Sequence, residues 1–251
     1  RDLFYPIEDG YDNWYLKFPQ SWGQAWTKQQ WNSFRRWYDV NNEKTLVSDD
    51  MPLVVSSWPQ TSWMKYFAKY LIENNKYFIY PKCSFTTNSG DAGVNHAEYD
   101  LTFQVPMQMN VNREFNFSDI AESQAVYDQF FENEKIGCIF EEYGDSLTVD
   151  LYGHKPNPEK GCFLTIKHLD FKALKTFGCC QMPRELNIIN NIEGNAFYLY
   201  NMDIRQKNPY KVSSLPISYN FKGFNIWTEY RIAKYFVKHF CQILKDKILK
   251  K

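Results

Sequence analysis

Apolar side chains recur at helical spacing in the stretch that follows residue 61. Four of them fall at positions i, i+4, i+7 and i+8, namely Trp63, Phe67, Tyr70 and Leu71. Pro59 precedes two candidate N-cap residues, Thr61 and Ser62, and the pattern ends at Asn74. The pattern predicts an amphipathic helix that begins after one of these caps.

A second helical stripe lies nearer the N-terminus. Trp31, Phe34 and Tyr38 share one face at i, i+3 and i+7, and Thr27 could cap the helix that carries them. The arginine pair at 35–36 is expected to point away from that apolar face. This stretch therefore predicts a second amphipathic helix.

Short apolar runs predict the strands. A continuous run at residues 77–80, closed by Pro81, favours a buried strand. Further strands are predicted at residues 14–18, 101–107, 147–151, 162–166, 171–177 and 196–200. More helices are predicted at 118–134 with Ser118 as its cap, at 182–194 between Pro183 and Gly194, and at 226–249. The helix at 182–194 lies between two predicted strands as a strand–helix–strand unit.

A polar loop follows the run at residues 77–80. From Asn88 to His96 it reads N-S-G-D-A-G-V-N-H. Gly90 and Gly93 permit positive φ and allow backbone N–H groups to approach a ligand. A helix, a buried strand and a polar glycine loop at the end of that strand are a common way for α/β proteins to present a binding site.

The Asn-rich segment at 108–116 marks the predicted domain boundary. We expect one α/β domain over residues 1–116 and a smaller α/β region over residues 117–251, which ends in a basic amphipathic helix. The first residue is Arg and not Met, so we expect the chain to be cut from a longer protein or processed.

Composition narrows the class of protein. The 29 basic and 29 acidic residues balance, which argues against a general nucleic-acid binder. No apolar run reaches the roughly 18 residues that a membrane span needs. The six cysteines show no C-x-x-C spacing, and we expect them to be reduced, mostly buried residues of a cytoplasmic protein.

Tryptophans are concentrated in the first quarter of the chain. Seven of the eight lie between Trp14 and Trp63. Such a concentration suits sugar recognition, because a pyranose presents C–H groups to an aromatic face while its hydroxyls form hydrogen bonds outward. A Trp-rich core explains the same composition, and both interpretations stay open.

No zinc spacing, phosphate-binding glycine loop or G-x-S-x-G elbow is present in the sequence, and nothing points to a Cys–His nucleophile pair. Two stretches instead match a known pattern. The first has the form W-G-x-x-W-x-x-x-x-W, with Trp22, Gly23, Trp26 and Trp31. The second combines Ser62-Trp63 with Y-P-x-x-S-x-x-x-N-x-G and a histidine, here Tyr80, Pro81, Ser84, Asn88, Gly90 and His96.

Over about residues 14–107 the chain thereby resembles the family-2 glycosyltransferases of bacterial surface-polysaccharide synthesis. The resemblance implies a partial GT-A (Rossmann-like) fold that transfers a sugar from a nucleotide-sugar to a polysaccharide or lipid-linked acceptor. It implies a divalent metal, Mn or Mg, in the whole enzyme. The family's nucleotide-binding half would lie upstream of Arg1, so we expect this chain to bind no metal tightly and to be inactive alone.

By the same resemblance, the substrate-binding residues are Trp22, Gly23, Trp26, Trp63, Asn88 and Gly90. His96 would reach the metal or the diphosphate, since imidazole suits Mn²⁺. The alternative for His96 is that it only satisfies backbone groups of its own loop. The segments 150–155 (DLYGHK) and 182–188 (MPRELNI) are similar to segments that follow the catalytic domain in such enzymes, with no assigned role.

The chain also departs from the family pattern. Gln24 stands where many relatives have a tryptophan, and Met64 and Lys65 follow Ser62-Trp63 where relatives often carry an acid. Lys65 has the wrong charge type for the general base of an acceptor hydroxyl, so the base lies elsewhere or is absent. Three carboxylates remain as weak candidates for the base, namely Asp49, Asp50 and Asp91.

We therefore expect the acceptor-side part of a glycosyltransferase. The alternative is a non-catalytic carbohydrate- or partner-binding module. The expected location is cytoplasmic, with peripheral contact to the inner membrane face through residues 226–251. Docking of that helix on residues 118–200 is the other interpretation.

Overall fold

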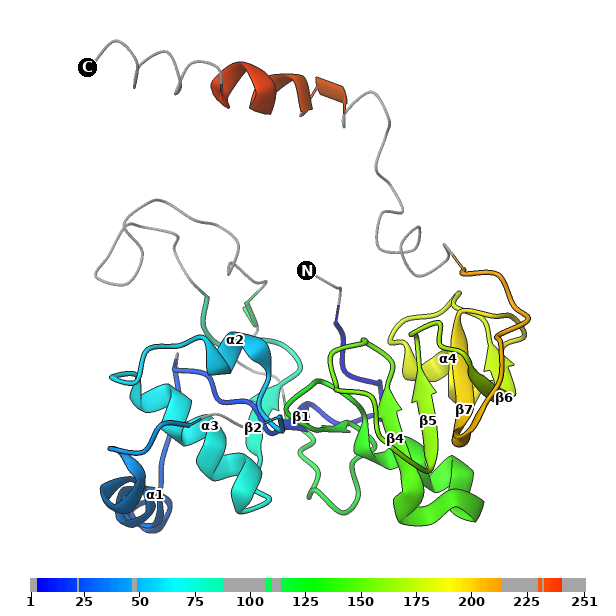
Figure 1. The fold of residues 1–251 in the computed structure, drawn as a ribbon. Coiled ribbons are helices and arrows are strands. Elements are labelled where there is room, and N and C mark those ends of the chain that lie inside the picture. The colour runs from blue at the N-terminus through cyan, green and yellow to red at the C-terminus, as the bar shows by residue number, and fades with distance from the viewer. Residues whose placement is uncertain are drawn as a thin grey trace. The chain divides into compact units, whose positions relative to one another are not determined.

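The computed structural model describes residues 4–21, 23–46, 49–87, 107–109, 114–213, 230–231 and 233–240. The chain divides into two compact units, Arg1–Val212 and Ser213–Lys251. The first unit is an α/β structure with two mixed sheets (Figure 1).

The first sheet has the strand order β2-β1-β3. β1 (Asn13–Leu16) pairs antiparallel with β2 (Phe78–Pro81) and parallel with β3 (Val126–Tyr127). Trp14 stacks on its cross-strand neighbour Tyr80, with ring centroids 4.9 Å apart. β3 comes after the predicted boundary at residue 116, so this sheet takes strands from both sides of it.

Three helices belong to the part of the chain that contributes β1 and β2. They are α1 (Lys28–Asn41), α2 (Leu53–Ser56) and α3 (Trp63–Glu73). α1 and α3 follow the two predicted helices, and Ser62 is the N-cap of α3. Phe34 of α1 and Phe67 of α3 are buried with ring centroids 5.0 Å apart, and Phe67 also contacts Phe78 of β2 at 6.3 Å. The predicted stripes therefore hold the helices together and pack them on the first sheet.

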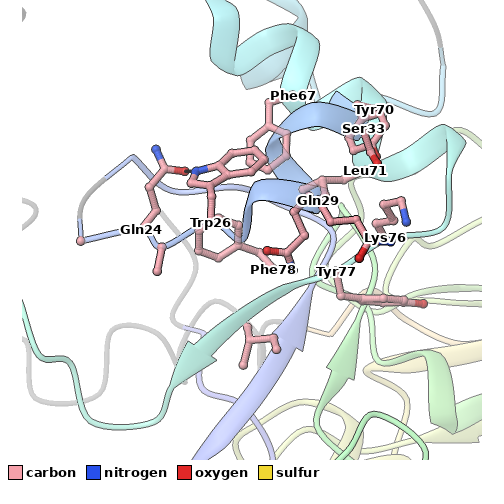
Figure 2. Close-up of a pocket in the computed structure, with 14 residues that line it drawn as sticks. Gln24, Trp26, Gln29, Ser33, Phe67, Tyr70, Leu71, Lys76, Tyr77 and Phe78 are labelled. Carbon is pink, nitrogen blue, oxygen red and sulfur yellow. Dashed lines mark hydrogen bonds between the residues drawn. The ribbon is translucent and has the colours of Figure 1, made fainter. Parts of the chain in front are cut away.

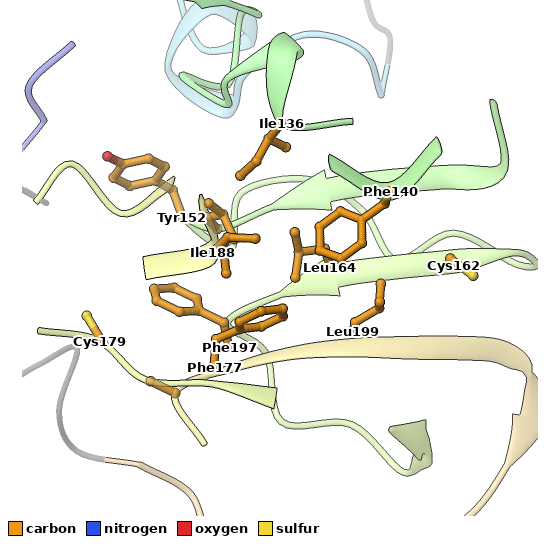
Figure 3. Packing of buried hydrophobic residues seen from close by; sticks show 12 residues of the cluster. Ile136, Phe140, Tyr152, Cys162, Leu164, Phe177, Cys179, Ile188, Phe197 and Leu199 are labelled. Carbon is orange, nitrogen blue, oxygen red and sulfur yellow. The ribbon is translucent and has the colours of Figure 1, made fainter. Parts of the chain in front are cut away.

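The second sheet has the strand order β4-β5-β7-β6. Its strands are β4 (Leu147–Asp150), β5 (Cys162–Thr165), β6 (Phe171–Phe177) and β7 (Phe197–Arg205), as the sequence predicts. A 3₁₀ segment, η1 (Glu134–Ser146), and the short helix α4 (Glu185–Ile189) pack against it. Figure 3 shows their common core, in which Ile136 of η1 and Ile188 of α4 meet Leu164 and Phe197 of the strands.

The prediction of a helix at 118–134 is wrong. The segment contains turns and β3. The reason is a distant carboxylate: Asp9 accepts hydrogen bonds from the Ser123 hydroxyl and from the N–H groups of Gln124 and Ala125 at 2.8–3.3 Å. These contacts hold the chain extended where local propensity favours a helix.

The run at 77–80 does not form a buried strand. β2 lies at the edge of its sheet, and Ile79 is 60% exposed.

The strand–helix–strand unit also differs from a Rossmann crossover, because β6 and β7 are antiparallel neighbours and α4 ends at Ile189, before Gly194. An antiparallel pair needs no long helix between its strands.

The prediction that the cysteines are mostly buried is wrong for those that the structure describes. Of the five that the structure describes, all are free thiols; Cys162 and Cys179 are buried, and the other three are exposed.

The predicted tail helix is described only in part, at residues 230–231 and 233–240, which are helical. The predicted strand at 101–107 falls outside the described residues except for Met107, which forms an isolated bridge with Ser84.

Candidate functional site

A groove of about 440 Å³ opens between α1, α3 and β2 (Figure 2). It has an aromatic side and a polar side. The residues that line it are Gly23, Gln24, Ala25, Trp26, Gln29, Gln30, Ser33, Phe67, Tyr70, Leu71, Lys76, Tyr77, Phe78 and Ile79. Trp26 and Gln24 lie at one end of the view, and Lys76 and Tyr77 lie at the other.

The start of α1 positions the glutamines of the groove. Thr27 and Gln30 form a capping box, in which the Thr27 hydroxyl accepts from the Gln30 N–H at 3.2 Å and the Gln30 side chain accepts from the Thr27 N–H at 2.8 Å. The turn before it requires glycine: Gly23 has φ +61°, and a Cβ there would lie 2.9 Å from Cγ2 of Thr86. The capping box and the turn at Gly23 therefore fix the α1 side of the groove.

The aromatic side is built around Trp26. Its ring centroid lies 4.5 Å from that of Phe67 and 5.8 Å from that of Phe34. Its Nε1 donates to the side-chain oxygen of Gln24 at 3.0 Å. The indole is thus held by packing and by a hydrogen bond, and it borders the groove without being fully buried.

The opposite end follows the C-terminus of α3. Asn75 has φ +47°, and this left-handed residue turns the chain so that Lys76 and Tyr77 face the groove. The Tyr77 hydroxyl donates to Glu134, and the Lys17 ammonium lies 4.8 Å from the centroid of the Tyr77 ring. Burial, with Glu134 beside it, raises the pKa of Tyr77 far above its usual value. Tyr77 therefore stays neutral and offers no general base.

The structure brings some of the predicted site residues together. Gly23 and Trp26 line the groove. Trp63 does not line it, but it is 37% exposed and belongs to the same aromatic cluster, with its ring centroid 6.1 Å from that of Phe67. Five predicted site residues lie outside the described residues: Trp22, Asn88, Gly90, Asp91 and His96.

Neither described candidate for the base lines the groove. Asp50 accepts two hydrogen bonds from the Lys69 ammonium at 2.9 and 3.0 Å, while Asp49 is exposed. Lys65 is buried and donates to the carbonyls of Ser56 and Trp58 at 2.8 and 3.0 Å. This lysine therefore ties α3 to the end of α2.

Sequence reasoning missed most of the polar lining. Gln29 and Ser33 lie four residues apart on α1, on the side away from Phe34, and a polar i, i+4 pair there is easily taken for solvated helix surface. Lys76 follows the asparagines that end the α3 pattern, so it resembles ordinary loop polarity. Only the approach of α1 to β2 shows that these residues share a groove.

The segments 150–155 and 182–188 come together in a buried polar junction. Arg184 donates to the Leu151 carbonyl at 2.8 Å and lies 4.5 Å from the centroid of the Tyr152 ring. Asp150 is fully buried and pairs with Lys167 at 2.9 Å. Glu185 accepts from the Tyr127 hydroxyl at 2.5 Å, which connects α4 to β3 of the first sheet. These segments hold the two sheets of the first unit together.

Metal ligands do not gather in the described part of the chain. No group of three or more His, Cys, Asp or Glu side chains is placed there to hold an ion. His96, the candidate ligand, lies outside these residues.

No family model, curated protein or solved structure matches the chain. The resemblance to family-2 glycosyltransferases accordingly rests on the motifs alone. Among the described residues, no helix is long and apolar enough to cross a bilayer.

Proposed function

We propose that the groove binds a sugar residue of an acceptor glycan and that the chain is the acceptor-side part of a family-2, GT-A glycosyltransferase. One observation carries the proposal: an indole held in place by Phe67 and Gln24 borders a groove of about 440 Å³ whose polar side chains, apart from one lysine, carry amides and hydroxyls. This is the combination that a pyranose requires, with C–H groups against an aromatic ring and hydroxyls against amides.

The motifs support the same proposal. Gly23 and Trp26 of the first motif line the groove, and Tyr80 of the second stacks on Trp14 of β1 in the adjoining sheet. The nucleotide-sugar donor, with its Mn or Mg ion, would be held by another half of the enzyme. The acceptor would be a polysaccharide or a lipid-linked glycan.

Sugar binding is tested by saturation-transfer NMR. The probes are the methyl glycosides of glucose, galactose, glucuronic acid and galacturonic acid, offered at millimolar concentrations to the 251-residue chain. We expect binding of at least one glycoside, lost on Trp26→Ala. Trp58→Ala is the matched control, because Trp58 is also partly exposed but packs on Phe18 away from the groove. Absence of binding for every glycoside contradicts the proposal.

A second experiment separates the transferase from a non-catalytic carbohydrate- or partner-binding module. The chain is incubated with UDP- and GDP-sugars, Mn²⁺ and the glycoside that it binds. We expect no transfer, because the donor half would lie outside this chain, and turnover would contradict that expectation. Calorimetry with UDP-galactose and Mn²⁺ then reports donor binding directly, and the reading frame upstream of Arg1 shows whether a donor half exists. Its absence would favour the binding module.

A further inference from the structure

The electrostatics of the groove indicate which sugars it accepts. Lys76 is the only charged residue among those that line the groove in the described part of the chain. No carboxylate lines it, and no ion pair involves Lys76 among the described residues. The groove therefore carries a positive charge that the described part of the protein does not neutralise by direct contact.

Two acids that lie beside lining elements of the groove have other partners. Glu73, at the end of α3, accepts from the Trp37 indole at 3.0 Å and lies 3.6 Å from the Lys69 ammonium. Glu134 pairs with Lys17 at 2.5 Å and accepts from the Tyr77 hydroxyl. Both carboxylates thus have partners of their own, which leaves the Lys76 ammonium to interact with a ligand or with solvent.

A second positive charge borders the same groove. Arg36 donates to the hydroxyl of Ser33, a lining residue, at 3.4 Å. It also acts on Tyr70, another lining residue: burial raises the pKa of Tyr70, and Arg36 works against that rise. Arg36 and Lys28 line a shallow hollow that shares Gln29 with the groove. Positive potential therefore extends along the polar side of the groove.

We infer that the groove selects an anionic sugar, which carries a carboxylate, as in a uronic acid, or a phosphate substituent. This inference rests on the proposed function, since it names the sugar that the same groove would bind. The C–H face of the ring would lie at the Trp26 end, and the anionic group would lie at the Lys76 end (Figure 2). An ammonium pairs with either anion, so the chemistry alone does not separate the two sources.

Lys76 also has a structural role that the test must keep intact. Its backbone N–H donates to the Leu71 carbonyl at 2.8 Å and closes the C-terminus of α3. That bond does not depend on the side chain, and the residue is exposed. Lys76→Gln should therefore fold normally while removing the charge, and Lys76→Arg should restore it.

The experiment compares acidic with neutral glycosides on the intact chain by saturation-transfer NMR. The pairs are methyl glucuronide with methyl glucoside and methyl galacturonide with methyl galactoside, and galactose 6-phosphate serves as the phosphate probe. We expect at least one acidic probe to bind about fivefold more tightly than its neutral counterpart, with a preference that weakens in high salt. Lys76→Gln should remove most of this preference, and Lys76→Arg should retain it.

Lys172→Gln is the matched control, because it removes the same charge from an exposed position on β6 that does not line the groove. Equal binding of acidic and neutral glycosides, unaffected by Lys76→Gln, overturns the inference and leaves the proposed function standing. If no probe binds, both fail. A preference that Lys172→Gln reduces as much as Lys76→Gln reflects net charge and also overturns the inference.

Discussion

At the scale of single residues, buried carboxylates connect segments of the first unit that lie far apart in the sequence. The side chain of Asp9 is 4% exposed, and it binds the ammonium of Lys82 at 2.8 Å as well as the segment 123–125. Glu132 is almost completely buried and accepts from the Tyr152 N–H at 2.7 Å. The two residues respond to pH in opposite ways.

We predict that Asp9→Asn destabilises the protein by about 2 kcal/mol, because the largely buried Lys82 side chain loses its closer anionic partner, and the buried one. Burial alone would raise the pKa of Asp9, but the hydrogen bonds from Lys82 and Ser123 outweigh it and lower the pKa. The stabilisation from Asp9 is therefore fully present above the pKa that Asp9 has in the unfolded state, about 3.9. It is lost as pH falls through the lower pKa that Asp9 has in the folded state.

Urea unfolding at several pH values measures both effects. Glu8→Gln is the control, because Glu8 lies 3.2 Å from the same lysine but its side chain is 83% exposed, so we expect a change of less than about 0.5 kcal/mol. Equal losses for the two variants would contradict the assigned role of Asp9.

Glu132 should make the protein less stable as pH rises. Its burial, with Asp128 nearby, raises its pKa to about 8 despite the charge of Lys155. In the unfolded state the pKa of Glu132 is about 4.3. At pH values between this and the raised pKa of the folded state, Glu132 is protonated only in the folded state. Stability therefore falls with rising pH by about 1.4 kcal/mol per pH unit for each such group, and Glu185, whose pKa burial raises to about 7, acts in the same direction.

Glu132→Gln removes one of these groups. We therefore expect the free energy of unfolding to fall less between about pH 5 and pH 8 in the variant than in the parent protein. At about pH 8 the variant should be the more stable of the two. Guanidinium titrations at the two pH values measure this. Glu193→Gln, at an exposed position, should leave the slope unchanged. A parent protein whose stability rises over this range would refute the prediction.

At the scale of elements, the connection between β6 and β7 depends on close backbone packing. Gly178 follows β6, and a Cβ at this position would lie 2.5 Å from the carbonyl oxygen of Glu193. Gly194 has φ +151°, and a Cβ added to it would lie 2.6 Å from the Cα of Gly178. The two glycines allow α4 and its following turn to return directly to β7.

Gly178→Ala is expected to destabilise the protein by about 2 kcal/mol, because backbone and not a flexible side chain blocks the added methyl group. The measurement is thermal and urea unfolding. Gly137→Ala is the control: a Cβ at Gly137 meets nothing within 4 Å, so its effect should stay within about 0.5 kcal/mol. Similar effects of the two substitutions would show that the close approach does not limit stability.

At the scale of the whole molecule, the described core clusters all come from residues before 213. The unit Arg1–Val212 therefore contains hydrophobic core clusters of its own, and we expect it to fold by itself. The basic amphipathic sequence at residues 226–251, the tail, has two interpretations: contact with a membrane surface and docking on residues 118–200.

We predict that a chain ending at Val212 remains folded, with an unfolding free energy within about 0.5 kcal/mol of the parent and an unchanged near-UV circular dichroism spectrum. A large loss of stability would instead show that the tail docks on the first unit. Sedimentation with phosphatidylserine vesicles, compared with phosphatidylcholine vesicles, then tests whether residues 226–251 attach the full chain to an anionic surface.

Elements with local signals could be predicted from the sequence. α1 and α3 follow from apolar residues at helical spacing behind Thr27 and Ser62, and β4 to β7 follow from short apolar runs between turns. It also pointed to Gly23 and Trp26, which line the groove. Each of these features depends on residues within a few positions of one another.

Tertiary structure decided the rest. The segment 118–134 has a helical pattern, but Asp9 binds its backbone from more than 100 positions away and β1 pairs with β3. β2 has a buried-strand pattern, but no strand covers its outer edge in the described sheet. Lys76 joins Trp26 in one groove only because α3 and the turn before α1 meet β2. Contacts between distant segments carry no local signal, and here they override propensity because each residue's preference is small beside a buried charge or a paired strand.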